Sequence, residues 1–219
     1  MSLEQLKENT LYQPLLLGAV ALLASASLAW AASATRDAIA AAEARDLRDS
    51  LAQVLPEGFA DNDLLADSAQ VEVGEAKPLT VYRARLGGTP QGTVFKVVGK
   101  GYAGPITILM AVDRDGRTLG VRVLKHTETP GLGDKIEIGK ADWITTLSGK
   151  TLESARWAVK KDGGEFDQFA GATITPRAVL NAVRGGLETF ARHREAMLGL
   201  PQDGEPAGKA IARKEGKSS

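Results

Sequence analysis

The sequence has 219 residues, of which 43% are hydrophobic and 25% are charged, and its formal net charge is zero. This length allows one domain of ordinary size with appendages, and the hydrophobic content excludes a chain that is disordered throughout. The balanced charge argues against a nucleic-acid-binding protein, which usually has an excess of basic residues. Without cysteine and with only two histidines, the chain has no disulfide, no cysteine-ligated cluster and no expected metal site.

An uncharged segment, residues 11–34, follows the N-terminal residues 1–10. About 20 helical residues cross the roughly 30 Å hydrocarbon core of a bilayer, so this segment is long enough to span a membrane. A cleaved signal peptide is the alternative, because Ala29-Trp30-Ala31 has the small residues of a cleavage site. The apolar run is long for a signal peptide, however. The positively charged N-terminal region of a signal peptide is also missing, because Lys7 is balanced by Glu4 and Glu8. We therefore predict a retained transmembrane helix.

The chain after the membrane segment shows helical and then strand periodicity. A helix is expected over 35–54, stopped by Pro56 and Gly58, with a partial apolar stripe that favours packing over partner binding. Residues 106–112 are continuously apolar, which is typical of a strand buried on both faces. Strands are expected at 70–73, 79–86, 93–98, 106–112, 118–124 and 156–160, and helices over 134–147 and 176–198.

This order of elements favours an α+β fold over a doubly wound sheet. We expect one domain over residues 35–200, with a mainly antiparallel sheet and helices packed against it. Residues 201–219 contain almost nothing apolar and are predicted to form a disordered tail. No dinucleotide-binding glycine motif is present, so the chain is not expected to oxidise NADH on its own.

Residues 167–176, with the sequence DQFAGATITP, are the most informative stretch. Thr175 is suited to cap the last helix and Pro176 to occupy its first position. The residues behind them repeat at helical spacing and predict one apolar face: Val179, Leu180, Val183, Leu187 and Phe190. Gly171 and Ala172 allow a ligand to approach the backbone closely, and Thr173 presents a hydroxyl near the helix start. The N–H groups at such a start favour a phosphate. A plain capped helix after a turn is the alternative.

A second stretch, residues 126–133, contains two glycines and one proline and therefore follows a tight, specific backbone path. Loops of this kind often carry function, although an ordinary connecting loop is the alternative. His126 is assigned no role.

The first stretch resembles the Asp-x-x-(Ser/Thr)-Gly-Ala-Thr sequence on which flavin transferases attach FMN to threonine. With the Glu128–Gly133 segment and the single N-terminal membrane segment, the chain resembles the G subunit of the Rnf/Rsx-type electron transport complex. It is more distantly similar to the C subunit of the sodium-translocating NADH:quinone reductase. The resemblance extends from the membrane segment to about Leu198. Ala170 departs from it, because Ser or Thr is more usual at that position.

The resemblance implies an FMN-binding domain whose FMN is joined through a phosphoester to Thr173. It implies that Glu128, Thr129 and Leu132 lie near the flavin, together with the stretch formed by Gly171, Ala172, Thr173 and Thr175. No catalytic residue is expected, because no activating base accompanies Thr173 in the sequence and a separate flavin transferase would form the bond. Lys160, Lys161 and Arg177 could neutralise phosphate, although solvent-facing roles are favoured.

The resemblance further implies an electron-relay subunit of an ion-translocating oxidoreductase, anchored once in the inner membrane, with its soluble domain in the periplasm. Its partners would be the other membrane and peripheral subunits of the complex. Two other hypotheses remain open at this point. One is a membrane-anchored flavin sensor or regulatory module, and the other is a domain that binds an unlinked phosphate compound.

Overall fold

The computed structural model describes residues 12–74 and 77–200 of the chain. These residues form two compact units, one that ends at Leu47 and one that begins at Arg48. The first unit contains most of helix α2 (Tyr12–Val54), which by length and composition is a candidate membrane span. The predicted N-terminal segment 1–10 and the predicted tail 201–219 lie outside the described residues.

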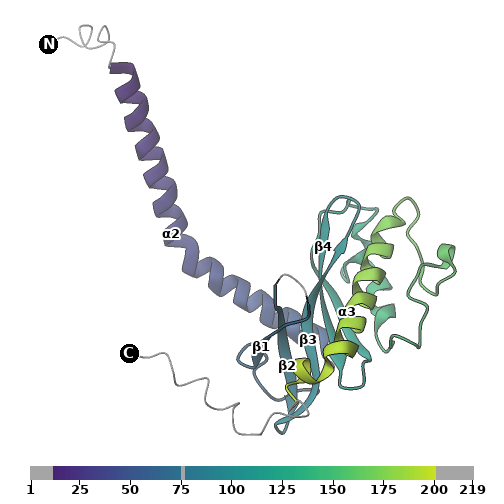
Figure 1. Cartoon of the computed structure of the whole chain (residues 1–219). Helices are drawn as coiled ribbons and strands as arrows, with labels where there is room; N and C mark the ends of the chain where they lie inside the picture. Colours follow the sequence, from purple (N-terminus) through teal and green to yellow (C-terminus); the bar gives the residue numbers. More distant parts are fainter. Residues whose placement is uncertain (1–11, 75–76, 201–219) are drawn as a thin grey trace. The chain divides into compact units, whose positions relative to one another are not determined.

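The second unit is built on a five-stranded antiparallel sheet in which every strand pairs with the strands next to it in sequence (Figure 1). The longest pairing joins the third and fourth strands in one unbroken register, from Gly92 opposite Asp113 to Lys100 opposite Pro105. The strands are β1 (Ser68–Val71), β2 (Leu79–Leu86), β3 (Thr89–Lys100), β4 (Pro105–Asp113) and β5 (Thr118–Lys125).

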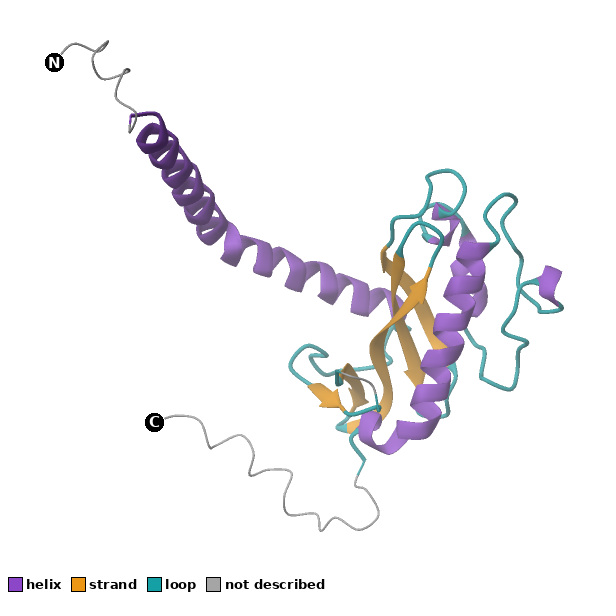
Figure 2. Cartoon of the chain, turned by 45° about the horizontal axis from the view of Figure 1, so that its top comes forward, coloured by secondary structure: helices purple, strands orange, loops and turns teal. Residues whose placement is uncertain are grey.

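Helix α3 (Ile174–Leu198) runs along one face of this sheet (Figure 2). The five apolar residues predicted to form its buried face are all at most 2% exposed. The helix approaches the sheet closely at Gly186, because a Cβ atom there would overlap the sulfur of Met110. The predicted α+β architecture, with helices packed on a mainly antiparallel sheet, is therefore confirmed.

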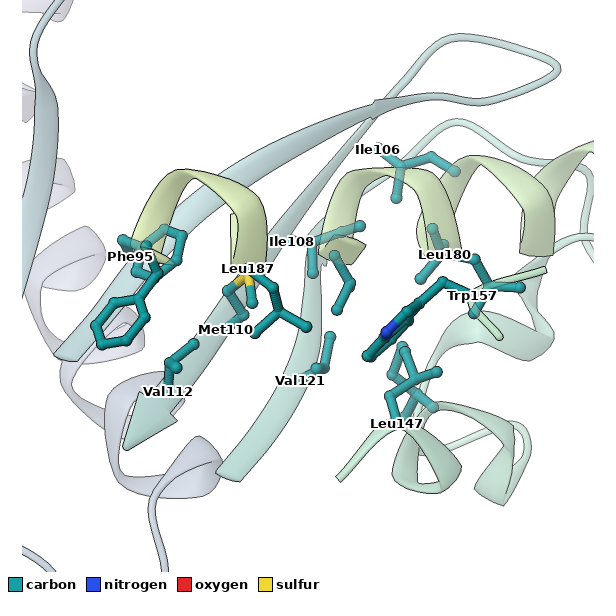
Figure 3. Close-up of a cluster of buried hydrophobic side chains, with 14 of the residues drawn as sticks. Phe95, Ile106, Ile108, Met110, Val112, Val121, Leu147, Trp157, Leu180 and Leu187 are labelled. Atoms are coloured by element: carbon teal, nitrogen blue, oxygen red, sulfur yellow. The ribbon is translucent and has the colours of Figure 1, made fainter. Parts of the chain in front are cut away.

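Strand β4 is buried on both faces, as its continuous apolar sequence predicted. Ile108 and Met110 face the main hydrophobic cluster, whereas Leu109 and Ala111 are buried outside that cluster. The main cluster also receives side chains from the segment between β5 and α3, including Leu147 and Trp157 (Figure 3).

The segment between β5 and α3 is less regular than predicted. The expected helix over 134–147 is wrong, since the structure has two short 3₁₀ helices there, η1 (Asp134–Ile136) and η2 (Asp142–Leu147). The expected strand over 156–160 is reduced to one bridge between Val159 and Phe166, followed by η3 (Lys160–Asp162). These residues bury Trp143, Ile144 and Leu147 through tertiary packing without completing a regular element.

Candidate functional site

Three segments that are distant in sequence meet around one pocket of about 320 Å³. They are the turn between β3 and β4, the loop that follows β5, and the start of α3. The residues that line the pocket are Tyr102, Glu128, Thr129, Leu132, Gly133, Gly171, Ala172, Thr173, Ile174 and Thr175. The pocket volume lies at the lower end of the range for small-molecule and cofactor sites.

The loop after β5 forms one wall of the pocket as a tight turn. The backbone N–H groups of Leu132 and Gly133 both donate to the carbonyl of Thr129, at 3.2 and 3.0 Å. Gly131 adopts φ of +77°, a conformation that residues with a side chain rarely adopt. The turn therefore holds Leu132 at the pocket, where its apolar side chain stays 44% exposed.

Glu128 joins the three segments through its buried carboxylate, which is only 5% exposed. One oxygen accepts a hydrogen bond from the hydroxyl of Thr175, at the start of α3. The other accepts from the backbone N–H of Ala103, in the β3–β4 turn, at 3.0 Å. A buried carboxylate needs such donors, because leaving it without them would cost several kcal/mol. The side chain thus fixes the relative positions of the three walls.

The segment before α3 is anchored in the core and then turns toward the pocket. The ring of Phe169 packs edge-on against Trp143 at 5.2 Å, and the indole N–H of Trp143 donates to the carbonyl of Asp167. Gly171 then adopts φ of +78°, which reverses the chain and brings Ala172 and Thr173 to the pocket. Thr173 is half-buried there.

The predicted cap of α3 is wrong by about two residues. The helix begins at Ile174 with Thr173 at the N-cap position, and the carbonyl of Thr173 accepts from the N–H of Arg177 at 3.4 Å. Thr175 does not cap the helix because its hydroxyl binds Glu128 instead. Pro176 lies in the first turn, where its missing N–H removes no helical hydrogen bond.

Two basic side chains near this turn, Arg177 and Lys160, form ion pairs. Arg177 donates two hydrogen bonds to Asp162, at 2.6 and 2.7 Å, and Lys160 lies 2.6 Å from Asp167. The hydrogen bonds from Arg177 hold the pKa of Asp162 below its ordinary value, and the same contacts raise the pKa of Arg177. Arg177 and Lys160 therefore connect η3 with the segment that leads into α3, and their side chains, 40% and 57% exposed, also face solvent as predicted.

Comparisons with known proteins identify the family of this chain. Residues 101–188, which include every lining residue of the pocket, match the family of FMN-binding domains. The G subunit of the ion-translocating oxidoreductase complex of Cereibacter sphaeroides is 51% identical over 195 residues, which cover 88% of this chain and 89% of the relative. The corresponding G subunit of Stutzerimonas stutzeri is 48% identical over 196 residues, with 88% and 86% covered.

The chain belongs to the G-subunit family of ion-translocating oxidoreductase complexes. This confirms the predicted resemblance, and the protein is therefore one subunit of an oxidoreductase. Among solved structures, the NqrC crystal structure from Shewanella oneidensis is similar to it, with 26% identity, a TM-score of 0.46, and coverage of 64% of this chain and 73% of that one.

All seven site residues predicted from the resemblance to the G subunit lie at the pocket. They belong to two stretches some forty residues apart, which the fold brings together. The sequence reasoning missed Tyr102, Gly133 and Ile174 as lining residues. Gly133 and Ile174 adjoin predicted residues, whereas Tyr102 belongs to a turn that only the pairing of β3 with β4 places beside the pocket.

Proposed function

We propose that this member of the G-subunit family is a membrane-anchored flavoprotein that relays electrons through an FMN joined by a phosphoester to Thr173. The family match to FMN-binding domains and the names of its relatives support the flavin and the complex. Helix α2 supports a single membrane anchor. The soluble domain would lie in the periplasm, and the remaining subunits of the complex would be its partners.

The position of Thr173 carries the proposal. Three threonines line the pocket, and they differ in what surrounds their hydroxyl groups. Thr175 is 1% exposed, and its hydroxyl is held by Glu128. Thr173 is half-buried at the helix start, and within residues 12–74 and 77–200 its hydroxyl makes no capping hydrogen bond. Thr173 is therefore better placed than Thr175 to be modified without breaking an internal contact.

The residues present fit a phosphate diester of FMN. The N–H groups of the first turn of α3 lack helical partners, and the 25-residue helix presents the positive end of its dipole there. This arrangement stabilises a negative charge by about 0.3–1 kcal/mol. Leu132 and Ile174 are 44% and 47% exposed at the same pocket and offer apolar contacts to a flat ring. When bound, FMN supplies the one- and two-electron chemistry, and the chain holds and orients it.

A separate flavin transferase would make the bond. A threonine hydroxyl is a weak nucleophile without a base beside it. Among the described residues, the carboxylate that lines the pocket is that of Glu128, which is already engaged by Thr175 and Ala103. With FAD as donor, the Thr173 oxygen bonds to the phosphorus of the FMN half while the pyrophosphate bond breaks. AMP leaves, and the hydroxyl proton is released.

The test is intact mass and peptide mapping of the full chain, co-expressed with a flavin transferase. We expect an adduct of FMN minus water on the Thr173 peptide, complete loss of it in Thr173→Val, and retention in the matched variant Thr129→Val. Flavin that leaves on denaturation would instead indicate a domain that binds an unlinked phosphate compound. The proposal would be contradicted if the chain carried no adduct although the co-expressed transferase modified another substrate.

A further inference from the structure

Tyr102 is the aromatic residue among those that line the pocket, and nothing in the sequence analysis assigned it a role. It lies in the turn between β3 and β4, and 73% of its surface is exposed. On the other side of the turn, the same residue borders a shallow depression formed with Val98 and Pro105. The tyrosine therefore stands at the mouth of the pocket.

The backbone on both sides of Tyr102 is fixed, on one side within the turn and on the other side to the loop after β5. The N–H of Gly101 donates to the carbonyl of Gly104 at 2.9 Å and closes the turn. The N–H of Ala103 donates to Glu128, and its carbonyl accepts from the hydroxyl of Thr127 at 3.1 Å. The Cα atom of Tyr102 is thereby held beside the pocket, while the ring can turn about its two side-chain torsions.

The turn is also built for close contact with that wall. A Cβ atom at Gly101 would overlap the carboxylate of Glu128 and lie 2.8 Å from the carbonyl of Gly104. At Gly104, φ is +159° and a Cβ atom would come within 2.5 Å of the hydroxyl of Thr127. Larger residues would push the turn away from the loop after β5, and Tyr102 away from the pocket with it.

We propose that the ring of Tyr102 packs against the isoalloxazine ring of the flavin and covers the mouth of the pocket; this inference rests on the proposed function. Two planar rings stack favourably, and a tyrosine can bury its ring face while its hydroxyl stays in water. Leu132 and Ile174 would contact the flavin from the other segments. Tyr102 is thus a flavin-contacting residue that positions the ring and limits its exposure to solvent.

The test compares the flavin-loaded full chain with Tyr102→Ala and Tyr102→Phe by flavin emission and by iodide quenching of that emission. A stacked phenol quenches emission, because it transfers an electron to the excited flavin and recovers it by recombination. We expect emission to rise several-fold in both variants. Iodide quenching should increase in Tyr102→Ala only, because phenylalanine keeps the cover. Val98→Ala, which alters an exposed residue of β3 outside the pocket, should match the wild-type chain.

Mass analysis of every sample separates the two proposals. If the wild-type chain carries no flavin adduct, the proposed function is contradicted. Loaded variants with unchanged emission and unchanged iodide quenching overturn the role of Tyr102 alone. If Tyr102→Ala does not bind flavin, Tyr102→Phe provides the test, because it removes only the hydroxyl oxygen. Unchanged flavin emission in Tyr102→Phe would then overturn the proposal. If the flavin of the variants were reduced more slowly by the membrane complex while its emission stayed unchanged, Tyr102 would be a protein-docking residue. This result would also overturn the proposal.

Discussion

Glu128 illustrates how a residue can lie at the expected place and have a different role from the one its position suggests. The resemblance placed it beside the flavin, and it does line the pocket. Both of its carboxylate oxygens, however, accept hydrogen bonds from the protein, one from Thr175 and one from Ala103. We therefore interpret Glu128 as a positioning residue that holds the walls of the pocket together.

The substitution Glu128→Gln tests this interpretation. The amide keeps the size of the side chain but replaces one acceptor oxygen by a donor, which would face the hydroxyl of Thr175 or the N–H of Ala103. A buried donor left without an acceptor costs about 1–3 kcal/mol. We expect the free energy of unfolding in urea to fall by that amount, and the yield of covalent flavin to fall as well.

Glu137→Gln is the matched control, because the carboxylate of Glu137 is more exposed and contacts the ring of His126 at 2.7 Å. This variant should change the free energy of unfolding much less and leave flavin loading intact. Equal effects of the two substitutions would argue against a special role of the Glu128 carboxylate.

At the scale of elements, the regular strands and helices could be predicted from the spacing of apolar residues in the sequence. The apolar run in β4 and the helical repeat from Val179 to Phe190 were both interpreted correctly, because each buries a regular face. The segment over 134–147 was not, since Gly139 and the exposed Ile138 interrupt its pattern and its buried residues are placed by tertiary contacts. Sequence patterns predict such irregular segments poorly because no single period describes them.

The same limit applies to the site. Its two stretches could be found from their composition, but the hydrogen bond from Thr175 to Glu128 joins residues 47 positions apart and has no local signature. The third wall, with Tyr102, could not be found because its place depends on the pairing of β3 with β4.

An arginine from the sheet binds the C-terminal end of α3. Arg83 in β2 donates to the carbonyls of Ala196 and Met197, at 3.0 and 3.3 Å. These carbonyls belong to the last helical turn, which carries the negative end of the dipole. The carbonyl of Ala196 also accepts from the N–H of Gly199 at 3.3 Å. Burial lowers the pKa of Arg83, and the nearby charge of Asp67 opposes that effect. Hydrogen bonds from a charged donor contribute about 1.5–3 kcal/mol each.

We therefore expect Arg83→Ala, which removes both hydrogen bonds, to lower the free energy of unfolding by at least about 2 kcal/mol. Hydrogen exchange should quicken at the last turn of α3 more than at its start. Arg184→Ala, which removes an exposed arginine of α3 paired with Glu188, should stay within about 0.5 kcal/mol of the unmodified chain. Unchanged exchange at Ala196–Gly199 in Arg83→Ala would show that the helix end is held by other contacts.

At the scale of the whole molecule, the compact second unit does not begin where α2 ends. It begins at Arg48, and the last turn of the helix contributes Leu51 and Val54, which are 1% and 3% exposed. Gly120 of β5 lies against this turn, since a Cβ atom there would come within 2.5 Å of the carbonyl of Val54. The domain proposed over 35–200 therefore contains a piece of helix that belongs to its packing.

Two soluble fragments test this dependence. Fragment 48–200 keeps Leu51 and Val54, whereas fragment 56–200 removes both and exposes the surface of β5 that they cover. Burying one such side chain contributes about 1.5–3 kcal/mol. We expect the shorter fragment to lose about 3–6 kcal/mol in the free energy of unfolding on the same basis, which is a large part of the stability of a domain of this size. Urea unfolding followed by tryptophan emission measures the difference, and the double variant Leu51→Ala/Val54→Ala in fragment 48–200 should reproduce most of it. Equal stability of the two fragments would show that the last turn of α2 is only a connection to the domain.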